Sequence, residues 1–189
     1  MFGFFKKKHT VITANATDWS FLSADMHSHF IPGIDDGPQT MEESISLLKD
    51  MQDAGFRKVI TTPHISMDYF PETEALIASG LEALRQEARL QGLSIELEAA
   101  AEYMIDENLL DKLHKNKPLF TINDQYLLVE MGFVQESPLL HQAIFEIQAA
   151  GYTPILAHPE RYNFYHDRPL TTITQLKNAG CLLQLNTIA

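Results

Sequence analysis

Cysteine, positive charge and long apolar runs are all scarce in this sequence. Its 189 residues contain one cysteine, Cys181, which excludes an intrachain disulfide framework. The 14 Lys and Arg residues stand against 25 Asp and Glu residues, and the formal net charge of -11 argues against a nucleic acid as the main partner. No apolar run is long enough to span a bilayer, so we predict no transmembrane segment. These features are typical of a cytoplasmic enzyme.

The first residues differ from the rest of the chain. Met1 to Lys8 places its aromatic residues before its lysines, which reverses the order of a secretory signal. We expect residues 1–20 to form a flexible tail and residues 21–189 to form one domain, because 45% of the residues are hydrophobic and no shift in composition divides them. A weak contact of Met1 to Lys8 with an anionic membrane surface is the less favoured alternative. It would place the protein peripherally at the inner membrane face.

The densest chemistry lies in Asp25-Met26-His27-Ser28-His29 and the turns that follow it. If residues 23–29 form a strand, His27 and His29 point the same way and can hold one metal ion together. Turns that contain Pro-Gly and Asp-Gly would bring Asp35 or Asp36 back over the same position. Two exposed histidines beside a turn are the alternative, since the His-x-His pattern is weak without its structural context.

The rest of the chain repeats one theme: an amphipathic helix ends at glycine, and a short apolar strand follows. Helices are expected after the capping-box sequence at Thr40 as far as Gly55, and at residues 71–90, 107–114, 137–151 and 170–179. Strands are expected at residues 58–64, 95–103, 126–130, 153–158 and 181–186. Alternating helices and strands with short connections predict a parallel sheet.

Potential metal ligands recur at the ends of these strands, namely His64, Glu102, Glu130 and His158. Each alone has a plainer explanation, such as a histidine satisfied within the core or a glutamate paired with a lysine. Together they favour a closing barrel, whose active sites assemble at the C-terminal strand ends. A doubly wound open sheet is the alternative, but it would spread these side chains too far apart. Imidazoles with carboxylates suit divalent Mn, Fe or Zn, and Glu102 is our choice for a carboxylate that bridges two ions.

These motifs resemble the polymerase-and-histidinol-phosphatase (PHP) superfamily, and within it the manganese-dependent protein-tyrosine phosphatases of bacterial capsule and exopolysaccharide systems. The resemblance runs from about Asp25 to Asn186. It rests in chain order on Asp25-Met26-His27-Ser28-His29, Ile34-Asp35-Asp36-Gly37-Pro38, Thr62-Pro63-His64, Ala101-Glu102-Tyr103, Val129-Glu130 and Ala157-His158-Pro159-Glu160-Arg161. The Asp-Asp-Gly-Pro turn points to the phosphatase branch.

The resemblance implies a distorted (β/α)7-type, TIM-like barrel around two or three divalent ions, usually Mn2+. It implies that the metal ligands are His27, His29, His64, Glu102, Glu130 and His158, and that Arg161 binds the substrate phosphate. The family also carries a final Ser-Asp-x-His motif that the sequence to Ala189 lacks. We therefore expect a barrel without its last strand-helix segment and open along one edge, which lacks the Asp and His that the final motif would supply to the metal site.

The implied activity is hydrolysis of phosphotyrosine on the C-terminal tail of a bacterial tyrosine autokinase by metal-activated water. Asp36 or Asp35 could protonate the leaving phenolate oxygen, or either could simply form the turn. A cysteine phosphatase needs an arginine six residues after its cysteine, and Thr187 stands there, so we expect Cys181 to be a core residue.

Two alternatives stay open: another phosphoesterase of the superfamily, such as a histidinol-phosphate phosphatase, or a non-catalytic module that binds phosphotyrosine. For a tyrosine phosphatase we expect a mainly aromatic rim around the site. Its members would be Met67, Tyr69, Phe70, Tyr162, Phe164 and Tyr165, although buried packing of these residues is about equally favoured. The sequence does not predict the oligomeric state.

Overall fold

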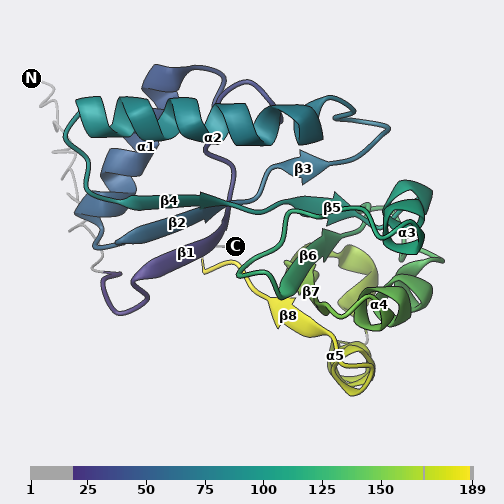
Figure 1. The fold of residues 1–189 in the computed structure, drawn as a ribbon. Helices are drawn as coiled ribbons and strands as arrows, with labels where there is room; N and C mark the ends of the chain where they lie inside the picture. The colour runs from purple at the N-terminus through teal and green to yellow at the C-terminus, as the bar shows by residue number, and fades with distance from the viewer. Residues whose placement is uncertain (1–18, 168, 188–189) are drawn as a thin grey trace, which may run out of the picture.

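The computed structural model describes residues 19–167 and 169–187 (Figure 1). The strands are β1 (Ala24–Ser28), β2 (Lys58–Thr61), β3 (His64–Ile65), β4 (Glu96–Ala99), β5 (Glu102–Met104), β6 (Tyr126–Glu130), β7 (Thr153–Ala157) and β8 (Leu182–Gln184). The α-helices are α1 (Met41–Asp53), α2 (Thr73–Leu90), α3 (Glu107–His114), α4 (Leu140–Ala149) and α5 (Pro169–Asn178). Two short 3-10 helices, η1 (Pro159–Arg161) and η2 (Asn163–Tyr165), follow β7.

The predicted helices are all present, with small shifts at their starts. Thr40 caps α1 as expected: its side chain accepts from the Glu43 amide, and the Glu43 carboxylate accepts from the Thr40 amide. The helices α2 and α4 begin two or three residues later than predicted, because their prolines lie before the first turn rather than in it. None of the helices among the described residues has the length and apolarity needed to cross a membrane.

All strand pairs are parallel, and they form two sheets in the orders β1-β2-β4 and β3-β5-β6-β7-β8. The helices α1 and α2 cover the first sheet, while α3, α4 and α5 flank the second (Figure 1). Among the described strands, β1 and β8 are not paired with each other, so the sheet does not close into a barrel. The expected open edge is therefore observed, and what the structure establishes is an α/β fold with parallel sheets.

The sequence predicted one strand over residues 58–64 and another over residues 95–103, and both predictions are wrong in the same way. Each strand is broken in the middle, which gives β2 with β3 and β4 with β5. Pro63 has no amide hydrogen for the ladder at the first break. Hydrogen bonding nonetheless continues across the breaks, since the Ala100 amide donates to the Thr61 carbonyl and the Glu102 amide donates to the Pro63 carbonyl. The two sheets thus form one bent surface, and His64 and Glu102 begin short strands rather than ending long ones.

Alternation along β6 separates two apolar clusters. Leu127 and Val129 join the main core under the helices, whereas Leu128 joins a small cluster on the other side of the sheet. The small cluster contains Ala100, Ile122, Leu128, Ile155 and Ala157, with Met26, Ile60 and Tyr126 packed against it. Residues of both sheets therefore meet on their inner, concave side. Glu130 lies two residues after Leu128, so its side chain projects from this inner face, as the parity of a strand requires.

The predicted tail at residues 1–20 lies outside the described residues except for Trp19 and Ser20. These two pack on the end of α1: the Trp19 amide donates to the Ala54 carbonyl at 2.8 Å, and Ser20 lies against Gly55, where an added Cβ would come within 2.9 Å of it. Trp19 and Ser20 therefore contact the domain predicted for residues 21–189. The proposed contact of Met1 to Lys8 with a membrane also lies outside the described residues.

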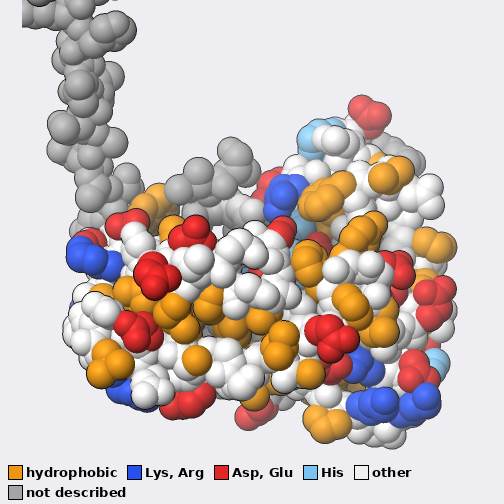
Figure 2. Space-filling view, turned by 90° about the horizontal axis from the view of Figure 1, so that it is seen from above, with side chains coloured by type: hydrophobic (Ala, Val, Ile, Leu, Met, Phe, Trp, Pro, Cys, Tyr) orange, Lys and Arg blue, Asp and Glu red, His pale blue; other side chains and the backbone are white. Residues whose placement is uncertain are grey.

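The outer surface over α1 and α2 mixes acidic and apolar side chains. Figure 2 shows acidic groups scattered among exposed hydrophobic ones, and no continuous field of lysine and arginine over the described part of this face. This distribution agrees with the acidic composition of the chain.

Candidate metal centre

Glu102 lies at the centre of a cluster of imidazoles. Its side chain is fully buried, and its Oε2 atom lies 3.0 Å from His27 Nε2, 3.5 Å from His29 Nε2 and 3.2 Å from His64 Nδ1. Its Oε1 atom lies 2.8 Å from His158 Nε2. Four histidines from three different parts of the chain thus surround one carboxylate, which is what the sequence predicted for a shared ligand.

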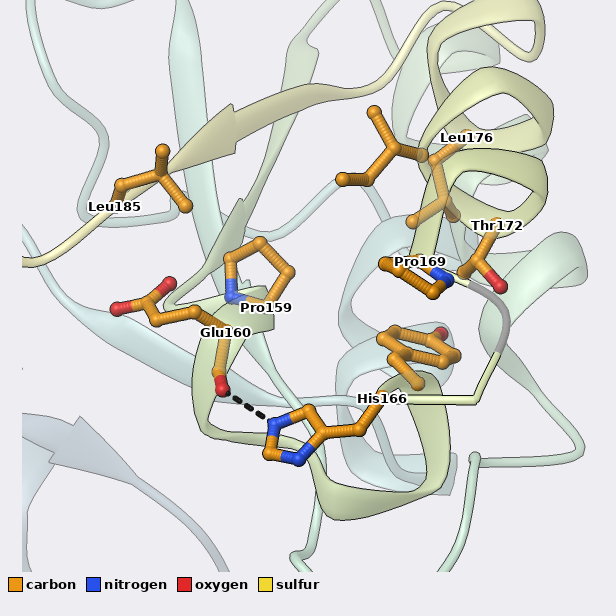
Figure 3. Close-up of a pocket in the computed structure, with 9 residues that line it drawn as sticks. Pro159, Glu160, His166, Pro169, Thr172, Leu176 and Leu185 are labelled. Carbon is orange, nitrogen blue, oxygen red and sulfur yellow. Dashed lines mark hydrogen bonds between the residues drawn. The ribbon is translucent and has the colours of Figure 1, made fainter.

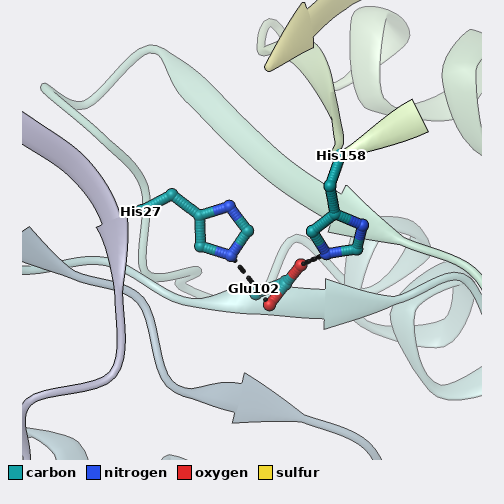
Figure 4. A group of neighbouring side chains, drawn as sticks. All are labelled: His27, Glu102 and His158. Carbon is teal, nitrogen blue, oxygen red and sulfur yellow. Dashed lines mark hydrogen bonds and ion pairs between the residues drawn. The ribbon is translucent and has the colours of Figure 1, made fainter. Parts of the chain in front are cut away.

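Two groups of potential ligands share this carboxylate. His27 and His158 form one group with Glu102, and their rings stack with centroids 5.4 Å apart (Figure 4). His29 and His64 form the other group with Glu102, with ring centroids 4.5 Å apart. A carboxylate that lies between two sets of imidazoles has the arrangement of a bridging ligand for two ions.

His158 reaches the cluster through an unusual backbone conformation. Leu156 on β7 packs in the main core, so alternation would direct His158 toward the helices. The strand ends at Ala157, however, and His158 has φ of 34°, in the left-handed region that non-glycine residues rarely adopt. The chain turns there, and the buried His158 ring contacts Glu102. Strain of this kind is typical of functional positions.

Glu130 completes the set of six predicted ligands but stands at its edge. Its Oε1 atom lies 2.7 Å from His64 Nδ1, and its side chain is buried. It belongs to neither of the two three-residue groups. The six side chains therefore converge on one region, as predicted, and their role as metal ligands is taken up as a proposal below.

The donor set fits divalent metal ions. Glu102 Oε2 is close to three imidazole nitrogens, yet neither this oxygen nor His64 Nδ1 makes a well-aligned hydrogen bond, although both are buried. The buried His158 Nδ1 also lacks a partner among the described residues. Buried polar atoms are nearly always satisfied, so unpartnered donor atoms that converge in this way fit a cation site. Imidazole and carboxylate donors suit Mn, Fe or Zn.

Hydrogen bonds outside the cluster orient two of the imidazoles. His27 Nδ1 lies 2.8 Å from the Gln184 side-chain oxygen, and His29 Nδ1 lies 2.7 Å from Asp35 Oδ2. Both partners are acceptors, so each Nδ1 carries a hydrogen, and each Nε2 atom is turned toward Glu102 and the candidate metal site. Gln184 also accepts from the His158 amide at 3.2 Å, which ties β8 to the turn after β7.

The electrostatics show how the cluster is balanced without a metal. Burial alone would lower the pKa of His29, but hydrogen bonds to Asp35 and Glu102 outweigh it and raise that pKa to about 10. Burial would also lower the pKa values of His27 and His64. Glu102 opposes this effect at His27 and Glu130 opposes it at His64, so both histidine pKa values are raised. Burial likewise fails to raise the pKa of Glu102, because hydrogen bonds from His158, His27 and His29 hold it well below its usual value. The buried carboxylates therefore favour the protonated form of the His27, His29 and His64 rings.

The two acids of the turn have different environments. The side chain of Asp35 is 1% exposed and accepts from His29 Nδ1, the His64 amide and the Gly37 amide. The side chain of Asp36 is 68% exposed, and its Oδ1 lies 3.4 Å from His64 Nε2. Gly37 is required in this turn, since an added Cβ would come within 2.6 Å of the His29 carbonyl oxygen. The geometry makes Asp35 an orienting group and leaves Asp36 as the free acid.

Arg161 lies at the end of η1, directly after the turn that carries His158. Its side chain is exposed and forms no ion pair with any carboxylate in residues 19–167 and 169–187. Its guanidinium carbon lies 5.0 Å from the ring centroid of Phe133. An arginine without an anionic partner beside this cluster is free to bind an anion.

The predicted aromatic rim is only partly present. Phe70 stacks on the His64 ring at 5.5 Å, and Met67 and Tyr69 are exposed beside it. Tyr162 and Tyr165 are buried instead, and the Tyr162 hydroxyl accepts from the Met131 amide. For these two tyrosines the buried alternative holds, because η1 and η2 turn the segment back into the core.

Two cavities flank the cluster. A groove of about 530 Å³ separates β1 from β8, and its lining includes His27, Asp25 and Gln184. A second, apolar pocket of about 280 Å³ lies beyond Pro159, and its walls include Leu176 and Leu185 (Figure 3). In that close-up the His166 ring donates to the Glu160 carbonyl, and the side chains drawn are mainly apolar. The groove reaches the imidazole cluster, and the apolar pocket does not contain any of its six residues.

Cys181 is a core residue, as predicted. Its side chain is buried, and burial raises the pKa of its thiol to about 11. A thiol in this state is a poor nucleophile at neutral pH. The cysteine therefore takes no part in the candidate site.

Parallel sheets with imidazoles and carboxylates gathered at one end of the bent surface define an α/β protein with a candidate metal site. A family model described as capsular polysaccharide synthesis, CpsB/CapC, matches residues 23–189. The chain belongs to this family, which confirms the resemblance to the tyrosine phosphatases of bacterial capsule systems.

Curated relatives agree with this assignment. The chain is 30% identical over 163 residues to tyrosine-protein phosphatase CpsB of Streptococcus agalactiae, covering 86% of this chain and 66% of the relative. It is 31% identical over 162 residues to the Staphylococcus aureus protein named as a CapC tyrosine phosphatase, covering 85% of this chain and 63% of the relative. It is 27% identical over 146 residues to tyrosine-protein phosphatase YwqE of Bacillus subtilis, covering 77% of this chain and 57% of the relative. The chain thus spans less than two thirds of the length of these relatives.

The fold is also similar to a solved structure. It superposes with a TM-score of 0.77 and 26% identity on a structure from work on YwqE of Bacillus subtilis and CpsB of Streptococcus pneumoniae, described there as metal-dependent tyrosine phosphatases. The match covers 86% of this chain and 65% of the other.

Reasoning from the sequence missed two residues of this region. Gln184 is the polar residue in an otherwise apolar strand, and that interruption was a usable signal. Phe133 follows Glu130 in a loop, and nothing in its local sequence distinguishes it from a core aromatic residue.

Proposed function

We propose that this protein is a metal-dependent protein-tyrosine phosphatase that acts on the phosphotyrosine tail of a bacterial tyrosine autokinase of polysaccharide synthesis or export. The observation that carries the proposal is Glu102, whose buried carboxylate is shared by two groups of imidazoles. The family and the metal-dependent phosphatases with a similar fold support the same reading. We further propose that the bent sheets are an incomplete (β/α)7-type barrel of the PHP fold.

The proposed ligands are His27, His29, His64, Glu102, Glu130 and His158, around two or three divalent ions, with Mn2+ as the physiological metal. When bound, such ions activate a water for attack at phosphorus and stabilise the charge on the phosphoryl oxygens. The remaining tasks belong to the chain. Gln184 and Asp35 hold the His27 and His29 rings with their Nε2 atoms toward the site.

Arg161 and Asp36 are proposed to act on the substrate directly. The unpaired guanidinium of Arg161 can bind two phosphate oxygens with its planar fork. Asp36 is exposed and close to His64 Nε2, so it can hold the proton that the leaving phenolate oxygen needs. Asp35 was an equal candidate from the sequence, but its three hydrogen bonds commit both of its oxygens. We propose a cytoplasmic location, at which the kinase tail is accessible.

The proposal is tested by phosphate release from a phosphotyrosine peptide, with histidinol phosphate as the competing substrate. We expect turnover of the peptide that is abolished by a chelator and restored by Mn2+, with little turnover of histidinol phosphate. Tight binding of the peptide without phosphate release would favour a binding module instead. Preference for histidinol phosphate would favour a small-substrate phosphoesterase.

The role of Arg161 is tested by Arg161→Lys, which keeps the charge but loses the fork. We expect turnover of the phosphopeptide to fall by about tenfold or more, in line with the loss of one charge-assisted hydrogen bond, while metal content stays unchanged. Arg85→Lys is the matched control, because Arg85 is fixed on the Leu97 carbonyl far from the cluster in the fold. Unchanged turnover in Arg161→Lys would show that Arg161 does not bind the phosphate.

A further inference from the structure

Phe133 is an exposed aromatic residue that contacts three side chains of the candidate site. Its ring centroid lies 6.0 Å from that of His158 and 5.6 Å from that of Tyr162, and the guanidinium carbon of Arg161 lies 5.0 Å from its centre. The residue is nevertheless 46% exposed. About half of the surface of Phe133 is thus open to solvent beside the imidazole cluster.

The loop that carries Phe133 is fixed to the segment that carries Arg161. The Met131 amide donates to the buried Tyr162 hydroxyl at 2.9 Å, which joins the end of β6 to the residue after Arg161. The Arg161 amide in turn donates to the His158 carbonyl at 2.9 Å. The backbones on both sides of the contact are therefore held in place, and only the long Arg161 side chain is free to move.

We propose that Phe133 is a positioning residue that holds the Arg161 guanidinium beside the imidazole cluster, ready for an incoming phosphate. This inference rests on the proposed function of Arg161. A free arginine side chain pays rotamer entropy when it binds an anion. Contact with the face of an aromatic ring restricts the guanidinium beforehand and leaves its N–H groups available in the plane of the fork. No carboxylate among the described residues competes for those groups.

The direct test is the side-chain NMR signal of Arg161 in ¹⁵N-labelled protein. An N–H over an aromatic ring is displaced upfield by the ring current, so we expect the Arg161 Nε–H signal to move downfield in Phe133→Leu. Phe133→Trp, which keeps an aromatic face, should retain an upfield signal. Phe145→Leu is the matched control, because Phe145 is an exposed phenylalanine on α4. An unmoved signal in Phe133→Leu would overturn the proposal.

The second test measures binding of inorganic phosphate to the Mn2+-loaded protein by calorimetry, and so does not depend on turnover. A cation–π contact at an exposed site is worth about two- to fivefold in affinity, so we expect Phe133→Leu to weaken phosphate binding by about that factor. Phe133→Trp should restore the affinity, and metal content should not change in either variant. The KM for a phosphotyrosine peptide should rise in the same proportion, with kcat nearly unchanged.

The effect must also depend on Arg161. In the Arg161→Ala background, Phe133→Leu should have no further effect on phosphate affinity, because there is no guanidinium left to position. An equal loss in both backgrounds would show that Phe133 acts on the phosphate or the fold by another route, and would overturn the proposal. Absence of turnover in the wild type, with the NMR and phosphate-binding results as expected, would count against the proposed function alone.

Discussion

Asp35 offers the sharpest test of how the site is built, because its two possible roles predict opposite results. As an orienting group it fixes the His29 ring, and as a general acid it would give a proton to the substrate. Replacing it by asparagine removes the charge and one acceptor atom but keeps the shape. In the structure, Asp35 Oδ2 accepts from His29 Nδ1 at 2.7 Å and from the His64 amide at 3.1 Å, and Oδ1 accepts from the Gly37 amide at 3.0 Å.

Asparagine has a single side-chain oxygen, so it can replace only one of the two Asp35 oxygens as an acceptor. With its oxygen toward His29 and His64, its NH2 group faces the half-buried Gly37 amide, and one donor is left without an acceptor. The reverse orientation leaves two donors unsatisfied and is disfavoured. An unsatisfied buried donor costs about 1–3 kcal/mol, and the partial exposure of Gly37 favours the lower end of that range. We therefore expect Asp35→Asn to lower the free energy of unfolding by about 1 kcal/mol.

The effect on the metal should be larger than the effect on the fold. Loss of a carboxylate that orients a ligating imidazole typically costs about 10- to 100-fold in metal affinity. We expect this loss in a Mn2+ titration of Asp35→Asn, and recovery of most phosphopeptide turnover when Mn2+ is raised to saturation. Asp50→Asn is the matched control, because Asp50 is an exposed aspartate on α1 that belongs to none of the groups of potential ligands. Wild-type metal affinity in Asp35→Asn, combined with lost turnover at saturating metal, would refute the orienting role and restore Asp35 as the general acid.

Two further predictions concern the same cluster. In Gln184→Leu, His27 Nδ1 and the His158 amide both lose their acceptor, so we expect metal affinity to fall by about tenfold. Asn186→Ala is a neighbouring control, and we expect its metal affinity to change less. Binding of Mn2+ should also release protons, because the pKa values of His27, His29 and His64 are raised in the metal-free protein, that of His29 to about 10, and ligating imidazoles must be neutral. Metal affinity should therefore rise with pH through the neutral range, and calorimetry in buffers of different ionisation enthalpy should report the released protons; a pH-independent affinity without proton release would contradict the assignment of these ligands.

The sequence predicted the site better than it predicted the strands. His27 and His29 were placed together from alternation alone, and His64, Glu102, Glu130 and His158 from their recurrence after apolar segments; all six converge in the structure. The placement of His27 and His29 follows from alternation along a strand, which is a local property, whereas His158 joins the cluster against that alternation, through its left-handed turn. Pro63 was a local sign that ladder hydrogen bonding stops, but the new strand that begins at His64 was not predicted. The break at residues 100–101 was not predicted either, since the apolar run there gives no local sign that two sheets bend apart.

Other features of the site depend on the tertiary structure. The left-handed conformation of His158 is maintained by Glu102 and by Gln184, which lie 56 and 26 residues away in the sequence. The orienting role of Asp35 arises because a turn brings it to His29 and to the His64 amide at once. The contact of Phe133 with Arg161 joins two loops that follow different strands. Contacts of this kind leave no periodic signal in a single sequence.

The position of the cluster links metal binding to the packing of the two sheets. His27 comes from β1 in the first sheet, whereas His64, Glu102 and Glu130 come from the second sheet. Gln184 on β8 contacts both His27 and the amide of His158, which follows β7. Without metal, a fully buried carboxylate is balanced only by imidazolium protons, which are lost as the pH rises through the raised pKa values. If the proposed ions bind only the folded state, they would replace those protons and stabilise the junction of the two sheets. We therefore expect the free energy of unfolding to increase when Mn2+ is added, and to increase more at alkaline than at acidic pH.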